Sequence, residues 1–150
     1  MSGGVRLSPA VYYVACLLGG YGVDLALDVE PAWPRWARAV GVVLLAAGVG
    51  VVATGLGRLR RSGTTIDPGK AATVLVVSGL YRVSRNPAYL GWCFIYVGVA
   101  LLGGSIASLL LLPVAMGFVQ HFAIRREEAY LQQAFGDSYT SYRSRVRRWI

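Results

Sequence analysis

Two charged clusters beside apolar runs could together bind a small zwitterion. In the first, Arg82 and Arg85 precede Asn86-Pro87, a capping residue followed by proline at the first helical position. Free N–H groups at a helix start, with arginines nearby, can hold a small anionic group. The second cluster is Glu127-Glu128, whose carboxylates can hold an ammonium group. An amino-acid head group carries one charge of each sign, so it matches the two clusters together.

Each cluster also has a simpler interpretation. The arginines could belong to a membrane anchor that faces lipid phosphates, and the glutamates could form ion pairs on a helix surface. A ligand site requires that the chain bring both clusters to the same side of a membrane. The segments that carry the clusters therefore decide between these interpretations.

The composition places the chain in the membrane class, because hydrophobic residues make up 55% and charged residues only 15%. Residues 86–124 carry no formal charge apart from any on His121. As one helix, these 39 residues would extend about 58 Å, roughly twice the thickness of the hydrocarbon core. The stretch must fold back, and Gly103-Gly104-Ser105 is the predicted turn. We expect one all-α integral membrane domain, residues 1–150, with about four spans: residues 9–27, 39–57, 87–102 and 106–124.

Glycine spacing and the polar tail indicate how the helices pack. Gly41, Gly48 and Gly55 recur every seven residues, so they share a face that permits close helix contact. The tail, residues 125–150, predicts cytoplasmic or interfacial helices, the first of which ends at Gly136. The second carries an apolar stripe typical of an interfacial helix. That stripe consists of Tyr139, Tyr142, Val146 and Trp149.

The basic residues predict the orientation. The chain has 15 Lys+Arg and a formal net charge of +8, which in a soluble protein would suggest nucleic-acid binding. All of them except Arg35 and Arg38 fall on one side of the predicted spans, so the positive-inside rule explains them. Both termini are then cytoplasmic, in the plasma or inner membrane if the source is prokaryotic, with lipids rather than nucleic acid as partners. There is no CxxC and His121 is the only histidine, so no metal site is expected.

Three motifs occur in a fixed order along residues 56–150. They are Gly79-Leu80-Tyr81-Arg82 with Arg85-Asn86-Pro87-x-Tyr89-Leu90-Gly91, then Glu127-Glu128-x-x-Leu131-x-x-x-Phe135-Gly136-x-x-Tyr139-x-x-Tyr142, then a terminal Val-x-Arg-Trp-Ile. These motifs resemble those of the isoprenylcysteine carboxyl methyltransferase and phospholipid methyltransferase superfamily. The resemblance implies a membrane enzyme that uses S-adenosylmethionine and releases S-adenosylhomocysteine. It also implies a lipophilic or small acceptor, such as an isoprenylcysteine carboxylate, a phospholipid amine or a thiol.

The resemblance further implies a cofactor site. Glu127 or Glu128 would hold the cofactor's ammonium, and Glu128 is favoured because it shares a stripe with Leu131 and Phe135. Arg82, Arg85 or the helix start would hold its carboxylate, and the predicted catalytic residues are Glu128 and Arg125. The predicted cofactor-binding residues are Tyr81, Arg85, Asn86, Pro87, Tyr89, Gly91, His121, Glu127, Glu128, Tyr139 and Tyr142.

Some members of this set have alternative roles. Tyr89, Tyr139 and Tyr142 would line the adenosine or face the sulfonium, but each could equally be an interfacial anchor. A buried role in helix packing is favoured over catalysis for His121. Asn86 stands where the superfamily often has a histidine, which leaves hydrogen bonding at this position but puts proton transfer in doubt.

Two other classes of function compete with a methyltransferase. A membrane reductase of the sterol type would use NADPH and would need a larger cofactor groove with more phosphate-binding groups. A small non-enzymatic membrane protein would have no reason to place both charged clusters on one rim.

Overall fold

The computed structural model of the protein describes residues 8–29, 33–63 and 73–150, and its secondary structure there is entirely helical. The elements follow one another along the chain as α1 Pro9–Ala26, α2 Arg35–Arg61, the short 3-10 helix η1 Gly79–Arg82, α3 Pro87–Gly103, α4 Ile106–Val119, the π-helical turn η2 Gln120–Ile124 and α5 Arg125–Arg145. Each predicted span corresponds to a helix. The fourth corresponds to α4 and η2 together, and α5 continues from η2 without a break.

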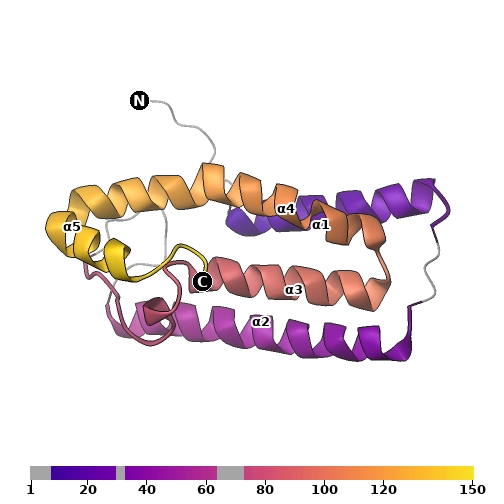
Figure 1. Ribbon diagram of the computed structural model, residues 1–150, viewed down its shortest axis with the longest axis horizontal. Helices are drawn as coiled ribbons and strands as arrows, with labels where there is room; N and C mark the ends of the chain where they lie inside the picture. The colour runs from indigo at the N-terminus through magenta and orange to yellow at the C-terminus, as the bar shows by residue number, and fades with distance from the viewer. Residues whose placement is uncertain (1–7, 30–32, 64–72) are drawn as a thin grey trace.

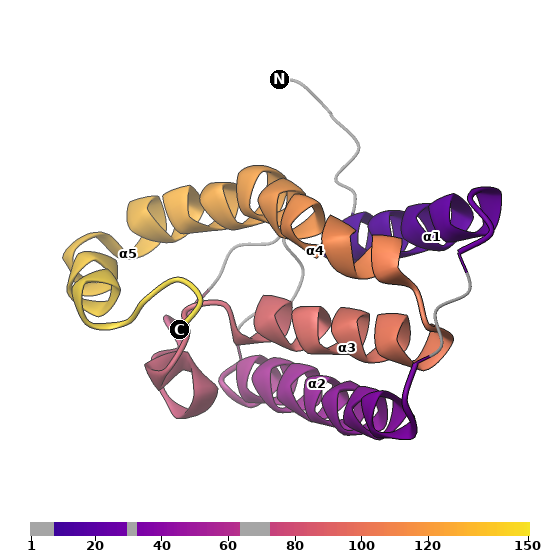
Figure 2. The ribbon, with the colours of Figure 1, turned by 45° about the vertical axis from the view of Figure 1, so that its right-hand side comes forward.

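The long helices form two antiparallel pairs. α2 packs along α3, and α1 packs along α4 (Figure 1). Seen after a 45° turn, the α1–α4 pair lies above the α2–α3 pair, and α5 extends beyond the bundle at the end where α3 begins (Figure 2). The chain then turns back, so its last residues lie beside the start of α3 (Figure 1). This return brings distant segments together at one end of the bundle.

Facing glycines allow α2 and α3 to approach closely, as the seven-residue spacing predicted. A Cβ built on Gly48 would lie 2.7 Å from the carbonyl oxygen of Gly91, and one built on Gly41 would lie 3.0 Å from that of Gly98. All four glycines are buried. Backbone against backbone leaves no room for a side chain, so glycine is required at these positions.

The predicted turn between α3 and α4 is confirmed. Gly104 adopts the left-handed conformation with φ 72°, and the Ser105 hydroxyl accepts a hydrogen bond from the backbone of Ser108 at the start of α4. The buried carboxylate of Asp24 accepts hydrogen bonds from the Ser105 hydroxyl and from the backbone N–H of Ala107. α1 is therefore fastened to this end of the hairpin.

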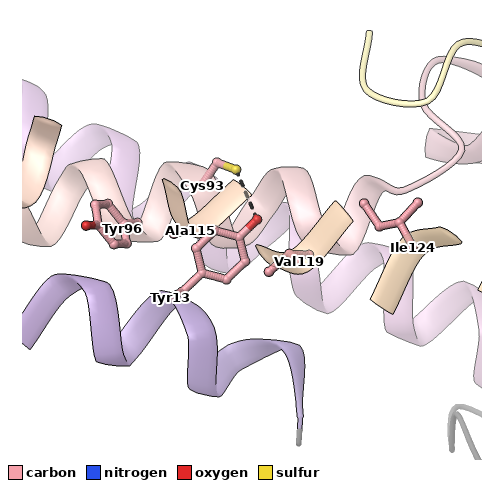
Figure 3. Packing of buried hydrophobic residues seen from close by; sticks show 6 residues of the cluster. All are labelled: Tyr13, Cys93, Tyr96, Ala115, Val119 and Ile124. Atoms are coloured by element: carbon pink, nitrogen blue, oxygen red, sulfur yellow. Dashed lines mark hydrogen bonds between the residues drawn. The ribbon is translucent and has the colours of Figure 1, made fainter. Parts of the chain in front are cut away.

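A buried hydrophobic cluster lies where α1, α3 and α4 meet. Tyr13 of α1 points between the other two helices, and its hydroxyl lies 3.3 Å from the sulfur of Cys93 (Figure 3). Its ring packs against Trp92 and Tyr96 of α3. The same hydroxyl donates to the carbonyl of Tyr89, one turn nearer the start of α3.

The helix lengths confirm the predicted class of an all-α membrane protein. Among the described residues, three helical segments are long and apolar enough to cross a membrane: Pro9–Ala26, Arg35–Arg61 and the continuous run Ile106–Arg145. The apolar helix α3 is shorter, at 17 residues. The number of spans and the side on which each terminus lies stay predictions.

The tail agrees with its predicted form at Gly136 and departs from it in two ways. α5 bends at Gly136, with φ 48° and ψ −120°, which is the predicted helix end. The second half stops at Arg145, however, so Val146 and Trp149 do not continue its stripe. Tyr139 and Tyr142 are 1% and 4% exposed, so this face packs against the protein rather than lying at the membrane interface.

Candidate functional site

The candidate site lies where three segments distant in sequence meet: the start of α3, the first half of α5 and residues 146–150, which we call the strap. The strap leaves α5 in an extended conformation at Val146, with φ −122° and ψ 129°. It runs back to the start of α3 (Figure 1). Trp149 packs against the buried cluster, and its indole N–H donates to the side-chain oxygen of Gln120 in η2 over 3.2 Å.

Residues 84–86 hold the backbone of the strap. The N–H of Arg85 donates to the carbonyl of Arg147 over 3.0 Å. The carbonyl of Arg148 accepts from the Asn86 amide nitrogen over 3.0 Å and from the Ser84 hydroxyl over 3.3 Å. Ser84 and Asn86 are both buried, so these hydrogen bonds are protected from water.

The predicted capping role of Asn86 is therefore wrong in its detail. Asn86 does occupy the N-cap position and Pro87 the first helical position, but the Asn86 side chain makes no capping hydrogen bond. Its amide points to the strap instead, and its own N–H donates to the Ser84 hydroxyl over 3.0 Å. A long-range hydrogen bond has replaced the local one.

Glu128 forms ion pairs with two arginines. Arg148 donates from both Nε and Nη2 to the two carboxylate oxygens, over 3.0 and 2.7 Å, and Arg85 Nη2 lies 3.3 Å from Oε1. The side chain of Glu128 is 11% exposed, that of Arg85 is 9% exposed and that of Arg148 is 29% exposed. The hydrogen bonds to Glu128 raise the pKa of Arg148. The bidentate geometry makes Arg148 the stronger partner of this carboxylate.

Arg85 keeps hydrogen-bonding capacity beyond these contacts. Its Nη1 donates to the hydroxyl of Tyr139 over a long 3.4 Å. Its Nε is buried and has no hydrogen-bond partner among the described residues. A buried guanidinium with an unused donor is an expected feature of a site for an anionic group.

Glu127 has different surroundings from its neighbour. Its carboxyl group accepts a hydrogen bond from the hydroxyl of Tyr89 over 3.0 Å, and burial of that group raises its pKa, although the residue as a whole is exposed. It makes no ion pair with another described residue. Tyr81 lies close by, and burial, followed by the nearby charge of Glu127, raises the pKa of the Tyr81 phenol. Glu127 is therefore an acid with no basic partner in the described part of the chain.

Of the other predicted cofactor-binding residues, Tyr142 contacts the site, whereas Pro87 and Gly91 pack against α2. The Tyr142 hydroxyl donates to the carbonyl of Tyr81 over 2.6 Å, which joins α5 to η1. Pro87 and Gly91 are buried against α2, beside Gly55 and Gly48 respectively.

Three predicted polar residues lie outside this group of contacts. Arg82 and Arg125 are exposed and form no ion pair with a described residue. His121 is also exposed and lies edge-on to the ring of Phe122, so its predicted buried packing role is wrong.

Sequence reasoning missed the strap and Arg148. The terminal Val-x-Arg-Trp-Ile motif contained Arg148, but the spacing of Val146 and Trp149 made the segment resemble a continuing helix. The sequence did show more arginines than acids in the tail, but this excess does not identify which arginine pairs with Glu128.

A surface hollow of about 650 Å³ adjoins the site. The connector before η1 contributes Leu75 and Val77, and the second half of α5 contributes Phe135, Asp137 and Tyr142. Tyr142 links this hollow to Tyr81, which lies near Glu127.

Comparisons with known proteins agree on one group of relatives. The model of a family described as phospholipid methyltransferase matches residues 36–138. A protein-S-isoprenylcysteine O-methyltransferase of Schizosaccharomyces pombe is 32% identical over 102 residues, which cover 61% of this chain and 43% of that protein. The Saccharomyces cerevisiae protein of the same name is 36% identical over 73 residues, covering 49% and 30% respectively.

The matched regions are partial. An uncharacterized protein of Haemophilus influenzae is 43% identical over 49 residues, which cover 33% of this chain and 76% of that protein. The chain spans less than half the length of the two isoprenylcysteine O-methyltransferases.

Proposed function

The chain belongs to the phospholipid methyltransferase family, and from this premise we propose that it is a membrane methyltransferase that uses S-adenosylmethionine. The superfamily predicted from the motifs is thereby confirmed. The observation that carries the proposal is an acid and a base in one site that each keep capacity to bind a further group. Glu127 has no basic partner among the described residues, and the buried Arg85 has an unused donor.

These two residues fit the amino-acid end of the cofactor. Glu127 would hold the ammonium and Arg85 the carboxylate, each by a charge-assisted hydrogen bond. The contacts favour Glu127 for the ammonium over Glu128, because Glu128 already accepts hydrogen bonds from Arg148 and pairs with Arg85. Tyr89 orients the Glu127 carboxylate through its hydroxyl. The hollow beside Tyr142 would hold the adenosine, with Phe135 as an apolar wall and Asp137 as a partner for hydroxyl groups.

When bound, the cofactor supplies a methyl group on a positively charged sulfur, open to in-line displacement by an acceptor. The chain's own contribution is alignment and exclusion of water rather than acid–base catalysis. A carboxylate or thiolate acceptor needs no base, and an amine has to arrive deprotonated. Arg125, predicted to be catalytic, is exposed and would contact an acceptor head group.

An apolar hollow supports an acceptor with a hydrocarbon part. This hollow, of about 200 Å³, lies between α1 and α3 and is lined by Tyr13, Trp92 and Tyr96 among others. The hydroxyl of Tyr13 donates to the backbone carbonyl of Tyr89. The side-chain hydroxyl of Tyr89 in turn donates to Glu127. We therefore place the acceptor chain in this hollow, with its reactive head toward Tyr89.

Isothermal titration on the purified protein in detergent tests the proposal. We expect S-adenosylhomocysteine to bind and NADPH not to bind. Glu127→Gln keeps the shape of the side chain and removes its charge, so it should weaken binding about 10- to 100-fold, the contribution of one charge-assisted hydrogen bond. Asp28→Asn removes the same charge from an exposed residue after α1 and should leave affinity unchanged.

Other outcomes lead to other functions. Binding of NADPH without S-adenosylhomocysteine would establish a reductase, and binding of neither would favour a non-enzymatic protein. If Glu127→Gln binds within twofold of wild type, Glu127 is not the ammonium partner.

A further inference from the structure

Arg148 joins Glu128 more strongly than Arg85 does, although both arginines reach the same carboxylate. Its two hydrogen bonds measure 3.0 and 2.7 Å, whereas Arg85 approaches Glu128 through one nitrogen at 3.3 Å. A bidentate guanidinium bonds both carboxylate oxygens and compensates the negative charge. Arg85 is thus left as a second, weaker partner of an acid whose charge is already compensated.

The charge count of this cluster is uneven. Glu128 carries one negative charge, and Arg85 and Arg148 together carry two positive charges. Arg85 is the more weakly paired arginine, since its side chain is 9% exposed and its Nε has no partner among the described residues. Glu127, the other acid of the site, makes no ion pair with a described residue. A buried donor without a partner costs free energy, so this arrangement favours an anionic group that can accept from Arg85.

We propose that Arg148 is a positioning residue that keeps Arg85 available for the carboxylate of the cofactor. Without Arg148, Arg85 would be the remaining basic partner of Glu128 in the described structure and would form the bidentate pair itself. Its charge would then be paired with Glu128, and fewer of its donors would be free for a ligand. This inference rests on the proposed function, because it concerns the carboxylate of the same bound cofactor.

The backbone of the strap fixes Arg148 for this role. Its carbonyl accepts from Ser84 and Asn86, which flank Arg85 in the sequence. The N–H of Arg85 donates to the adjacent carbonyl of Arg147. The two arginines are therefore held at a set separation by main-chain contacts, and only their side chains compete for Glu128.

The experiment compares two ligands on purified full-length variants in detergent by isothermal titration. S-adenosylhomocysteine has the carboxylate, and its decarboxylated form keeps the ammonium and lacks the carboxylate. Arg148→Gln should weaken binding of S-adenosylhomocysteine about tenfold, the lower end for a charge-assisted hydrogen bond. Binding of the decarboxylated form should stay within about twofold of wild type, since that ligand does not use Arg85.

A double variant separates positioning from structural damage. When Glu128→Gln is combined with Arg148→Gln, the side chain at position 128 is neutral and no longer captures Arg85. Affinity for S-adenosylhomocysteine should then return to within about threefold of wild type. Arg38→Gln removes the same charge from an exposed position on α2 and should bind both ligands as wild type does.

The proposal is overturned if Arg148→Gln weakens both ligands equally, or neither, or if the double variant binds no better than Arg148→Gln alone. A wild-type protein that does not bind S-adenosylhomocysteine at all would instead overturn the proposed function itself.

Discussion

Glu127 and Glu128 are adjacent acids whose surroundings are set by residues from other segments. Successive side chains on a helix point about 100° apart, so both can lie near one site without sharing partners. The sequence predicted the acidic pair, and the apolar stripe on α5 favoured Glu128 only modestly, because Glu127 also reaches Leu131 and Phe135. What separates them is Arg148, which arrives from the non-helical strap 20 residues later, and Tyr89, which arrives from α3. Such long-range partners leave no local pattern in the sequence.

Asn86 provides a test of the strap at the level of a single residue. Asn86→Leu removes the hydrogen bond to the Arg148 carbonyl and should cost about 1 kcal/mol, which corresponds to roughly fivefold more opening of the strap. Asn86→His retains a ring N–H that can donate, so it should resemble wild type. Tryptic cleavage within the strap after Arg147, followed by mass spectrometry, measures this opening.

Cleavage after Arg61, at the end of α2, is the internal control and should occur at one rate in all three proteins. Equal cleavage of the strap in Asn86→Leu and wild type would show that Asn86 does not hold it.

Helix positions followed more directly from the sequence than helix partners did. The long apolar runs predicted α1 to α4, because a segment that crosses lipid must be long, apolar and helical. The spacing of Gly41, Gly48 and Gly55 predicted the packing face of α2. It did not identify Gly91 and Gly98 as the facing residues, because glycine is common throughout this chain, with 19 residues.

Gly48 and Gly50 form a matched pair for testing this packing. A Cβ at Gly48 would meet the backbone of α3 at 2.7 Å, whereas a Cβ at Gly50 would have no atom within 4 Å. Gly48→Ala should therefore lower the free energy of unfolding by about 1–3 kcal/mol. Gly50→Ala should leave it unchanged or raise it by up to about 1 kcal/mol, since alanine favours the helix.

Titration with SDS in mixed micelles, followed by circular dichroism, measures both glycine variants. If the two unfold at the same SDS fraction, the close contact between α2 and α3 does not contribute to stability.

At the scale of the whole molecule, the segments that the charge pattern assigned to the cytoplasmic side lie together at one end of the bundle. The site combines the start of α3, the first half of α5 and the strap (Figure 1). The positive-inside rule predicted that these segments share a side, because a charge crosses lipid only at high cost. It could not predict the return of the strap, which depends on main-chain hydrogen bonds.

Reporter fusions test the orientation of the molecule. A fluorescent protein fused after residue 150 should fold and fluoresce in the cytoplasm. Alkaline phosphatase fused in the turn Gly103-Gly104-Ser105 should be active on the opposite side, because α3 and α4 are predicted to be two separate spans. Reporters that lie on the same side would contradict that hairpin and, with it, the four-span topology.

The number of residues in the π-helical turn η2 matters independently of which residues they are. It joins α4 to α5 with a wider hydrogen-bonding pattern than the α-helices on either side. Loss of one residue here would rotate α5 by about 100° relative to α4, whatever residue was lost. Glu127 and Glu128 would then turn away from Tyr89 and Arg85 with every side chain of the site intact. A single residue within this long helical run thus sets the rotation of α5, and of the candidate site that it carries, relative to α4.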